Sequence, residues 1–270
     1  MDFKTCIALM SLLVFTISAP SQEITQAPAI VTDRPDVTES SIVLPKGSLQ
    51  FENGVTWTND HGDESADFTE TLVRFGLSTR SELRVVIPNY VADLSGSTAS
   101  SGFGDIALGA KQQLGPLHGQ FDLSVIVALS LPTGAERISS HGFDPFIKFP
   151  WSRNLAKRWS IGGMQSFFWN TEDGRRNPTW ETTFLTEKEI TTTWNAFLEY
   201  AGDFAKSGGS KQIAHFGTAY RITPTQQLDC HFGFGLSRAA PHWFLAVGYS
   251  IRVDSLFGAK SVETGTIPGE

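Results

Sequence analysis

The sequence predicts an all-β protein, a single antiparallel transmembrane β-barrel of about twelve strands, and three observations favour it. Stretches of about ten residues between Ser48 and Arg252 alternate apolar and polar side chains, as strands do because successive side chains leave opposite faces. The apolar face carries the bulky aromatic residues and its partner carries Gly, Ser, Thr and charges, which is expected with lipid outside and water inside. A secretory signal precedes these strands.

Residues 1–21 are predicted to be this signal peptide, cleaved before Gln22. The apolar run Cys6–Ile17 is shorter than the roughly 20 residues that a membrane-spanning helix needs. Its removal leaves Cys230 as the cysteine of the mature chain, so an intramolecular disulfide is excluded.

Residues 22–47 have no strand periodicity, and Pro35 and Pro45 disfavour regular structure there. This segment is either a periplasmic lead-in to the barrel or a plug that folds into the lumen and pairs with charges on the wall. The charged residues of its second half suit either arrangement, and they are Asp33, Arg34, Asp36 and Glu39.

Residues 48–252 are predicted to form the barrel, and residues 253–270 a C-terminal tail. The alternation is regular in the first five strands and in the last four. It is weaker in the middle, where Gln165 interrupts the apolar face. The predicted strands are Ser48–Thr58, Phe68–Leu77, Glu82–Tyr90, Gly104–Leu114, Phe121–Leu131, Asp144–Phe149, Trp159–Trp169, Trp180–Leu185, Ile190–Tyr200, Gln212–Ile222, Leu228–Leu236 and Trp243–Arg252.

The connections favour an outer-membrane protein with both termini in the periplasm. Short links are expected after the even strands, as in Ser78–Ser81 and Thr186–Glu189, and longer links after most odd ones, as in Asn59–Asp67 and Ala201–Lys211. Short periplasmic turns and longer outer loops are the arrangement of bacterial barrels. Trp and Tyr residues gather near the predicted strand ends, as interfacial belts require; they are Trp57, Trp169, Trp180, Tyr200 and Trp243 at the outer side and Trp151, Trp159 and Tyr220 at the periplasmic side.

The face opposite the aromatic residues supplies the candidate lumen residues. They line either a mutually paired polar core or a solute path, because an unpaired charge in a narrow lumen is costly. The candidates are Glu52, Glu70, Arg74, Glu82, Arg84, Asp105, Lys111, Glu199, His215, Arg221, Asp229 and His231.

The short link at Ser78–Ser81 brings Arg84 towards Arg74 on the neighbouring strand. Two guanidinium groups at one level repel each other unless carboxylates lie between them. We therefore expect Glu70, Glu82, Asp33 or Asp36 beside this pair.

Catalysis, metal binding and nucleic-acid binding have little support. A barrel hydrolase needs Ser and His together on the lipid face, whereas His215 and His231 are predicted to face the lumen. These two histidines could meet, but without a third ligand they do not predict a metal site. The net charge of −7 and the absence of a basic run argue against nucleic acid, and no cofactor is expected.

Two stretches resemble a family of outer-membrane transporters named after the MetA pathway of phenol degradation. Thr32-Asp33-Arg34-Pro35-Asp36 and the following Pro45–Gly54 resemble its opening, and Thr223–Asp229 with Gly233–Ser237 resembles its closing strands. The resemblance covers about Thr32–Arg252 and implies an outer-membrane barrel with a role in solute uptake, without any catalytic residue. The chain departs from the pattern in extending past the last strand, so no aromatic residue ends it.

Together these observations predict a non-enzymatic channel or uptake protein of the bacterial outer membrane, for small solutes that include hydrophobic or aromatic ones. Its expected partners are outer-membrane lipid, the barrel-assembly machinery and the solute. Two alternatives stay open: a structural or adhesive barrel without transport, and an outer-membrane hydrolase.

Overall fold

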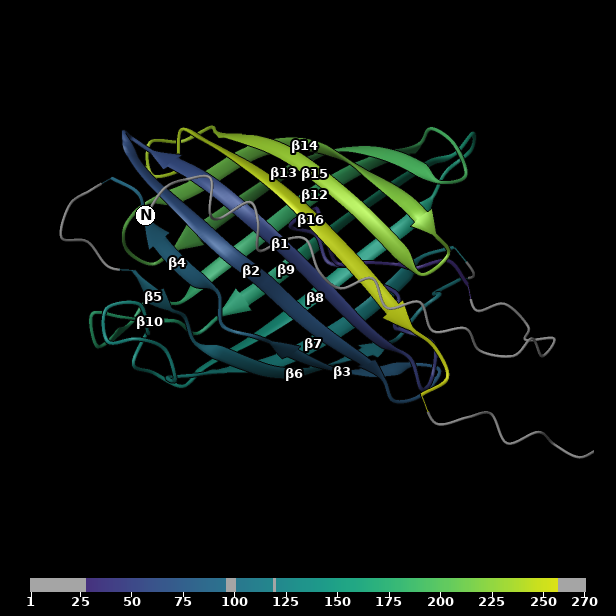
Figure 1. Cartoon of the computed structure of the whole chain (residues 1–270), viewed down its shortest axis with the longest axis horizontal. Helices are drawn as coiled ribbons and strands as arrows, with labels where there is room; N and C mark the ends of the chain where they lie inside the picture. The colour runs from purple at the N-terminus through teal and green to yellow at the C-terminus, as the bar shows by residue number, and fades with distance from the viewer. Residues whose placement is uncertain (1–27, 96–100, 119, 257–270) are drawn as a thin grey trace, which may run out of the picture.

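The computed structural model of the chain describes residues 28–95, 101–118 and 120–256, which form one closed barrel (Figure 1). The predicted signal peptide and residues 257–270 of the predicted tail lie outside the described residues. No helix in the described part of the chain is long and apolar enough to cross a membrane.

The described strands follow one another as predicted, with some interruptions. They are β1 (Leu49–Asp60), β2 (Asp63–Gly76), β3 (Ser81–Val86), β4 (Tyr90–Asp93), β5 (Gly102–Phe103), β6 (Ile106–Gln113), β7 (Asp122–Leu131), β8 (Asp144–Asn154), β9 (Trp159–Phe168), β10 (Thr171–Glu172), β11 (Arg175–Arg176), β12 (Thr179–Glu189), β13 (Trp194–Ala205), β14 (Ser210–Thr223), β15 (Gln226–Gly235) and β16 (Trp243–Val253).

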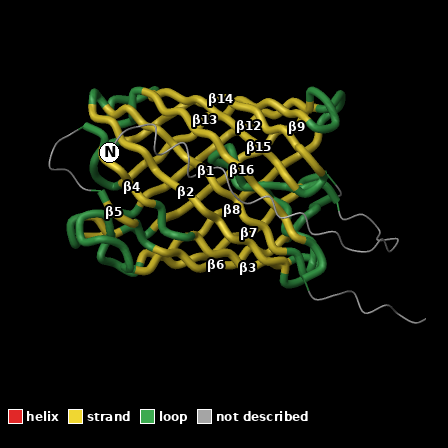
Figure 2. The backbone as a smooth tube through the Cα atoms, in the orientation of Figure 1, coloured by secondary structure: helices red, strands yellow, loops and turns green. Residues whose placement is uncertain are grey.

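Antiparallel pairing of neighbours closes the ring at β1, which pairs with β2 on one side and β16 on the other. The barrel has twelve strands, because β4 and β5 extend β3 and β6, and β10 and β11 form a separate hairpin. Figure 2 shows the tilted strands as a continuous wall with loops at both ends. Leu49 pairs with Val253, so β1 begins and β16 finishes at one end of the barrel, here called the terminal end; the other is the loop end.

The two faces of the wall divide as the alternation predicts. Val127 and Leu198 are each 55% exposed on the outer face, whereas Ile126 next to Val127 is 1% exposed. Such an apolar outer surface is unusual for a protein in water and is expected where lipid surrounds the barrel. The chain is accordingly an all-β outer-membrane barrel.

Aromatic residues mark both rims of this apolar surface. Trp57 and Trp180 are exposed towards the loop end, and Trp159, Trp194 and Tyr220 towards the terminal end. Their amphipathic rings suit the interface between lipid and water.

The interruption at Gln165 has a local explanation. Its amide donates to Thr182 Oγ1 at 2.6 Å, and its carbonyl oxygen accepts from Trp180 Nε1 at 3.0 Å. All three side chains lie on the outer face. Their polar atoms form hydrogen bonds with one another, so they do not face lipid without a hydrogen-bond partner.

Several predicted connections were wrong. The turn expected at Thr186–Glu189 is strand, since β12 runs to Glu189 and the turn falls at residues 190–193. The long link expected at Asn59–Asp67 is a two-residue turn, His61-Gly62, with φ values of 57° and 107°. Likewise, β13 and β14 run through most of the expected loop 201–211. At the strand ends that face water, the backbone hydrogen bonds between strands continue, but the two faces no longer differ in hydrophobicity. Hydrophobic alternation in the sequence therefore underestimates strand length.

The predicted strand Glu82–Tyr90 is interrupted at residues 87–89, between β3 and β4. Pro88 lies in this gap and has no N–H to donate to a ladder. Ile87 N still donates to Thr71 O at 2.8 Å and Gly104 N to Asn89 O at 2.8 Å, so the wall stays connected around the break.

Candidate functional site in the lumen

Residues 30–44, here called the lumen segment, lie inside the barrel. Ile30 N donates to Pro224 O in the turn between β14 and β15, and Leu44 N donates to Glu82 Oε2 on β3. The segment therefore enters the lumen at the terminal end and returns there to begin β1. Of the two arrangements that the sequence left open for this segment, these contacts correspond to the one inside the lumen.

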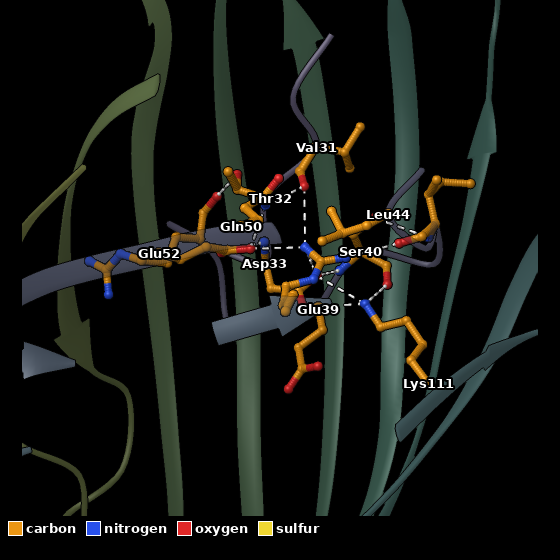
Figure 3. A network of polar contacts seen from close by, with 12 residues as sticks. Val31, Thr32, Asp33, Glu39, Ser40, Leu44, Gln50, Glu52 and Lys111 are labelled. Atoms are coloured by element: carbon orange, nitrogen blue, oxygen red, sulfur yellow. Dashed lines mark hydrogen bonds and ion pairs between the residues drawn. The ribbon is translucent and has the colours of Figure 1, made fainter. Parts of the chain in front are cut away.

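A cluster of buried charges holds the segment against β1, β2, β3 and β6 (Figure 3). Arg74 and Arg84 are directly opposite each other in the β2–β3 pair, as the short link predicted. Glu82 lies between them, at 2.9 Å from Arg74 Nε and 2.9 Å from Arg84 Nη1. Glu52 accepts from Arg74 Nη1 at 2.9 Å.

Asp33 of the lumen segment completes this cluster. Its carboxylate lies 2.5 Å from Arg84 Nη1, 3.1 Å from Lys111 Nζ and 3.4 Å from Arg74 Nη1. Burial alone would raise the pKa of Asp33, but the three cations together hold it well below its usual range. Asp33 therefore stays ionised and ties the segment to three wall strands.

Backbone groups of the lumen segment add to the charge pairing. Asp33 N donates to Glu52 Oε2 at 2.7 Å, and Arg74 Nη2 donates to Ile42 O at 3.1 Å. Lys111 Nζ donates to Ser40 O at 2.8 Å. An irregular buried segment needs such partners, because its amides and carbonyls have no strand neighbour.

A second anchor lies on β13 and β14. Glu199 accepts the backbone N–H groups of Val37 and Thr38, both at 2.8 Å. Its other neighbour is His215 Nε2 at 2.6 Å, and His215 Nδ1 lies 3.2 Å from His231 Nδ1. The two histidines, which the sequence placed where they could meet, are thus neighbours, and the pair connects to the segment through Glu199.

A third anchor is Arg34, whose Nη1 lies 2.6 Å from Glu70 and whose Nη2 lies 3.6 Å from Asp229. Its guanidinium packs on the bare backbone of Gly54 and Gly248, where an added Cβ would come within 2.2 Å and 2.6 Å of it. Only glycine leaves room for this arginine at both positions. Glu70 therefore pairs with Arg34 and not with the Arg74–Arg84 pair.

Two candidate residues, Asp105 and Arg221, lie away from these anchors. The prediction that Asp105 lies on the lumen wall was wrong. Asp105 lies between β5 and β6 and accepts the backbone N–H groups of Thr133, Gly134 and Ser140 at 2.8–2.9 Å. Burial alone would raise the pKa of Asp105, but these hydrogen bonds together outweigh burial and lower it. The Asp105 carboxylate thus holds the loop between β7 and β8 in place. Arg221 lies near the terminal end and donates to Thr192 O.

A cavity of about 580 Å³ lies towards the terminal end, between the lumen segment and parts of β8, β9 and β12–β15. Its polar lining includes Asp36, Glu39, Glu187, Asn195 and Arg221. The segment therefore has partners on both sides of the lumen, such as Arg84 on β3 and Glu199 on β13, and leaves this cavity beside it.

The sequence missed Lys148 and Glu39 as partners. Lys148 Nζ lies 2.6 Å from Glu39 Oε1, and Arg84 Nη2 lies 2.6 Å from Glu39 Oε2. Because Ile147 and Phe149 alternate with Lys148, its inward direction could have been predicted. No three His, Cys, Asp or Glu side chains among the described residues are arranged to hold a metal ion.

A family model described as "Putative MetA-pathway of phenol degradation" matches residues 32–253 of the chain, which is most of its length. The chain belongs to this family. The match begins within the lumen segment and ends with β16, so it covers the segment together with the barrel. No match was found among curated proteins.

Solved structures with the same fold are outer-membrane channels and porins. A COG4313 outer membrane channel from Pseudomonas putida F1 is 14% identical, with a TM-score of 0.64 over 81% of this chain and 99% of that one. The NanC porin is 10% identical, with a TM-score of 0.57 over 76% of this chain and 100% of that one. A KdgM porin in complex with disordered oligogalacturonate is 9% identical, with a TM-score of 0.52 over 76% and 98%. Together with the fold, these similarities place this member of the MetA-pathway family in the bacterial outer membrane.

Proposed function

We propose that the protein is a channel that takes up small solutes across the bacterial outer membrane, with its terminal end in the periplasm. The observation that carries this proposal is the cavity of about 580 Å³ beside the lumen segment. A barrel with a purely structural role would be expected to fill its lumen, since voids forfeit packing contacts. Here the ion pairs and hydrogen bonds of the segment fix it across the lumen and leave the cavity beside it unfilled.

The side chains of the lumen wall also favour solutes that have an apolar or aromatic body. Phe146 and Phe168 face inward from β8 and β9, and Phe197 and Phe244 pack around His215. Aromatic rings among polar groups are the usual lining of a small-molecule site. The barrel-assembly machinery and outer-membrane lipid are the other partners that this proposal includes.

The hydrolase alternative gains no support from the histidines. His215 contacts the Glu199 carboxylate through Nε2, but its Nδ1 faces His231 and not a serine or cysteine. The described contacts of His61 and His141 are with the Asp60 carboxylate and the Glu136 carbonyl, again without a nucleophile. A hydrolytic site needs a histidine that accepts the proton of a nucleophile. We therefore propose that the protein is not an enzyme.

Planar-bilayer recording of the purified protein tests the proposal. We expect discrete conductance steps, and we expect Ala219→Trp to lower the conductance, because Ala219 is buried at the cavity wall. Ala110→Trp is the matched control, since Ala110 lies on the outer face of β6. Bilayers that stay insulating with a protein shown to be folded by its heat-dependent gel migration would overturn the proposal.

A further inference from the structure

One stretch of the lumen wall combines an apolar surface with two cations. Gly109, Ala128, Phe146 and Phe168 are consecutive partners across β6, β7, β8 and β9, so they lie in one row facing the lumen. None of the four is fully buried. The two phenylalanine ring centroids are 5.4 Å apart.

The cations lie at the edges of this row. Arg84 is the β3 partner of Gly109 and continues the row at its end. Lys148 lies two residues beyond Phe146, with Nζ 5.5 Å from the ring centroids of both Phe146 and Phe168. An ammonium over an aromatic face is attracted by the ring quadrupole, so Lys148 is fixed at the border of the apolar surface.

One carboxylate bridges the two cations, and it belongs to the lumen segment and not to the wall. Glu39 places one oxygen 2.6 Å from Lys148 and the other 2.6 Å from Arg84. It is also the least buried carboxylate that binds Arg84, with 14% of its side chain exposed against 3% for Asp33 and none for Glu82. Glu39 further lines the cavity. It is therefore the carboxylate that a solute could replace most easily.

If the Glu39 carboxylate leaves its position, the surrounding charges favour another anion there over an empty position. If Glu39 moved away, Arg84 would keep Asp33 and Glu82, whereas the described ion pairs give Lys148 no second contact. Glu181 lies two strands away at the same level and accepts from Ser166 Oγ, and it forms no described ion pair with Lys148. A buried cation without a partner is costly, so the vacated position would attract a carboxylate.

We propose that this surface binds a small carboxylate solute with an apolar or aromatic body, whose carboxylate replaces Glu39 between Arg84 and Lys148. The body of the solute lies on Phe146 and Phe168, over the space that Gly109 and Ala128 leave. The inference rests on the proposed channel function and adds the class of solute. Because Glu39 belongs to the lumen segment, solute binding also loosens one contact of that segment.

Titration calorimetry of the purified full-length protein with benzoate tests the inference. Benzyl alcohol is the probe for the aromatic ring without the carboxylate, and acetate is the probe for the carboxylate without the ring. We expect benzoate to bind at least tenfold more tightly than either, because only benzoate offers both the ring and the carboxylate. Lys148→Met and Phe168→Ala should each weaken benzoate binding about tenfold or more. Lys157→Met, at an exposed lysine in the turn between β8 and β9 at the terminal end, should leave it unchanged.

Glu39→Gln separates competition from a structural role. If benzoate replaces Glu39, removing that charge tightens benzoate binding; if Glu39 helps to build the site, the same change weakens it. Absence of benzoate binding in a protein that conducts ions would overturn this inference and leave the channel function intact, whereas a folded protein without conductance would overturn the channel function itself. Equal binding of benzoate and benzyl alcohol would likewise contradict the inference.

Discussion

At the scale of single residues, charge balance explains why the lumen segment is inside the barrel. The wall places four cations together, Arg74, Arg84, Lys111 and Lys148, but among the described residues of the wall only Glu52 and Glu82 form ion pairs with them. Asp33 and Glu39 of the segment supply the two missing carboxylates. Because unpaired buried charge is costly, a barrel without the segment would carry an uncompensated positive surface.

Asp33→Asn should therefore release the segment. Loss of one member of a buried pair costs about 3–5 kcal/mol, and about 3 kcal/mol corresponds to roughly a hundredfold more open molecules. The readout is the rate at which a maleimide labels Ser41→Cys, introduced in a Cys230→Ala background, because Ser41 is 2% exposed. We expect labelling to accelerate by about that factor.

Asp36→Asn is the matched control for this measurement. Burial, followed by the nearby Glu199 and Glu187 carboxylates, raises the pKa of Asp36 well above its usual range. Its neutralisation removes no cation's partner, so the labelling rate should stay close to that of the parent. Equal acceleration by both substitutions would contradict the charge-balance explanation.

Whether these contacts could be predicted depends on whether they follow from the pattern of neighbouring residues in the sequence. The Arg74–Arg84 pair and the meeting of His215 with His231 depend only on strand alternation and short links, and both are observed. The partners of Arg34 depend on where an irregular segment runs across the lumen, which periodicity does not encode. Asp105 follows the inward alternation of its strand, yet it lies beyond the end of β6, where alternation no longer determines direction.

At the scale of elements, the strands are longer than hydrophobic alternation predicts. The strand expected at Trp180–Leu185 is β12, Thr179–Glu189, whose last residues include Glu187, Lys188 and Glu189. These residues still pair with β13. Strand length is set by backbone hydrogen bonding, whereas alternation reports only the part that faces lipid.

The depth of each strand in the membrane can be tested with arginine on the outer face. Val127 lies in the middle of β7 and Leu131 at its end towards the loops. Val127→Arg should cost about 2–4 kcal/mol of unfolding free energy and Leu131→Arg about 0–1 kcal/mol, because the cost of a lipid-facing charge falls towards the interface. Denaturant titrations in lipid vesicles measure both values, and equal costs would contradict the assigned position of β7.

At the scale of the whole molecule, the barrel class, the strand order and the two faces followed from the sequence, because each depends on a period of two repeated along the chain. The occupant of the lumen did not. Its position is determined by contacts between residues far apart in the sequence, such as Thr32 with Gln227, 195 positions away. These contacts fix the segment across the lumen and leave the cavity beside it, on which the proposed channel function depends.

The most direct test of the segment's position is a disulfide between the segment and the wall. Ser41 Oγ lies 2.7 Å from Ser152 Oγ on β8, so Ser41→Cys with Ser152→Cys should crosslink readily in a Cys230→Ala background. Ser41→Cys with Ser250→Cys is the control, because Ser250 lies in the lumen on β16, across the barrel from β8. A gel shift reversed by reductant for the first pair and absent for the second is the expected result; no crosslink in the first pair, or equal crosslinking in both, would contradict the position of the lumen segment beside β8.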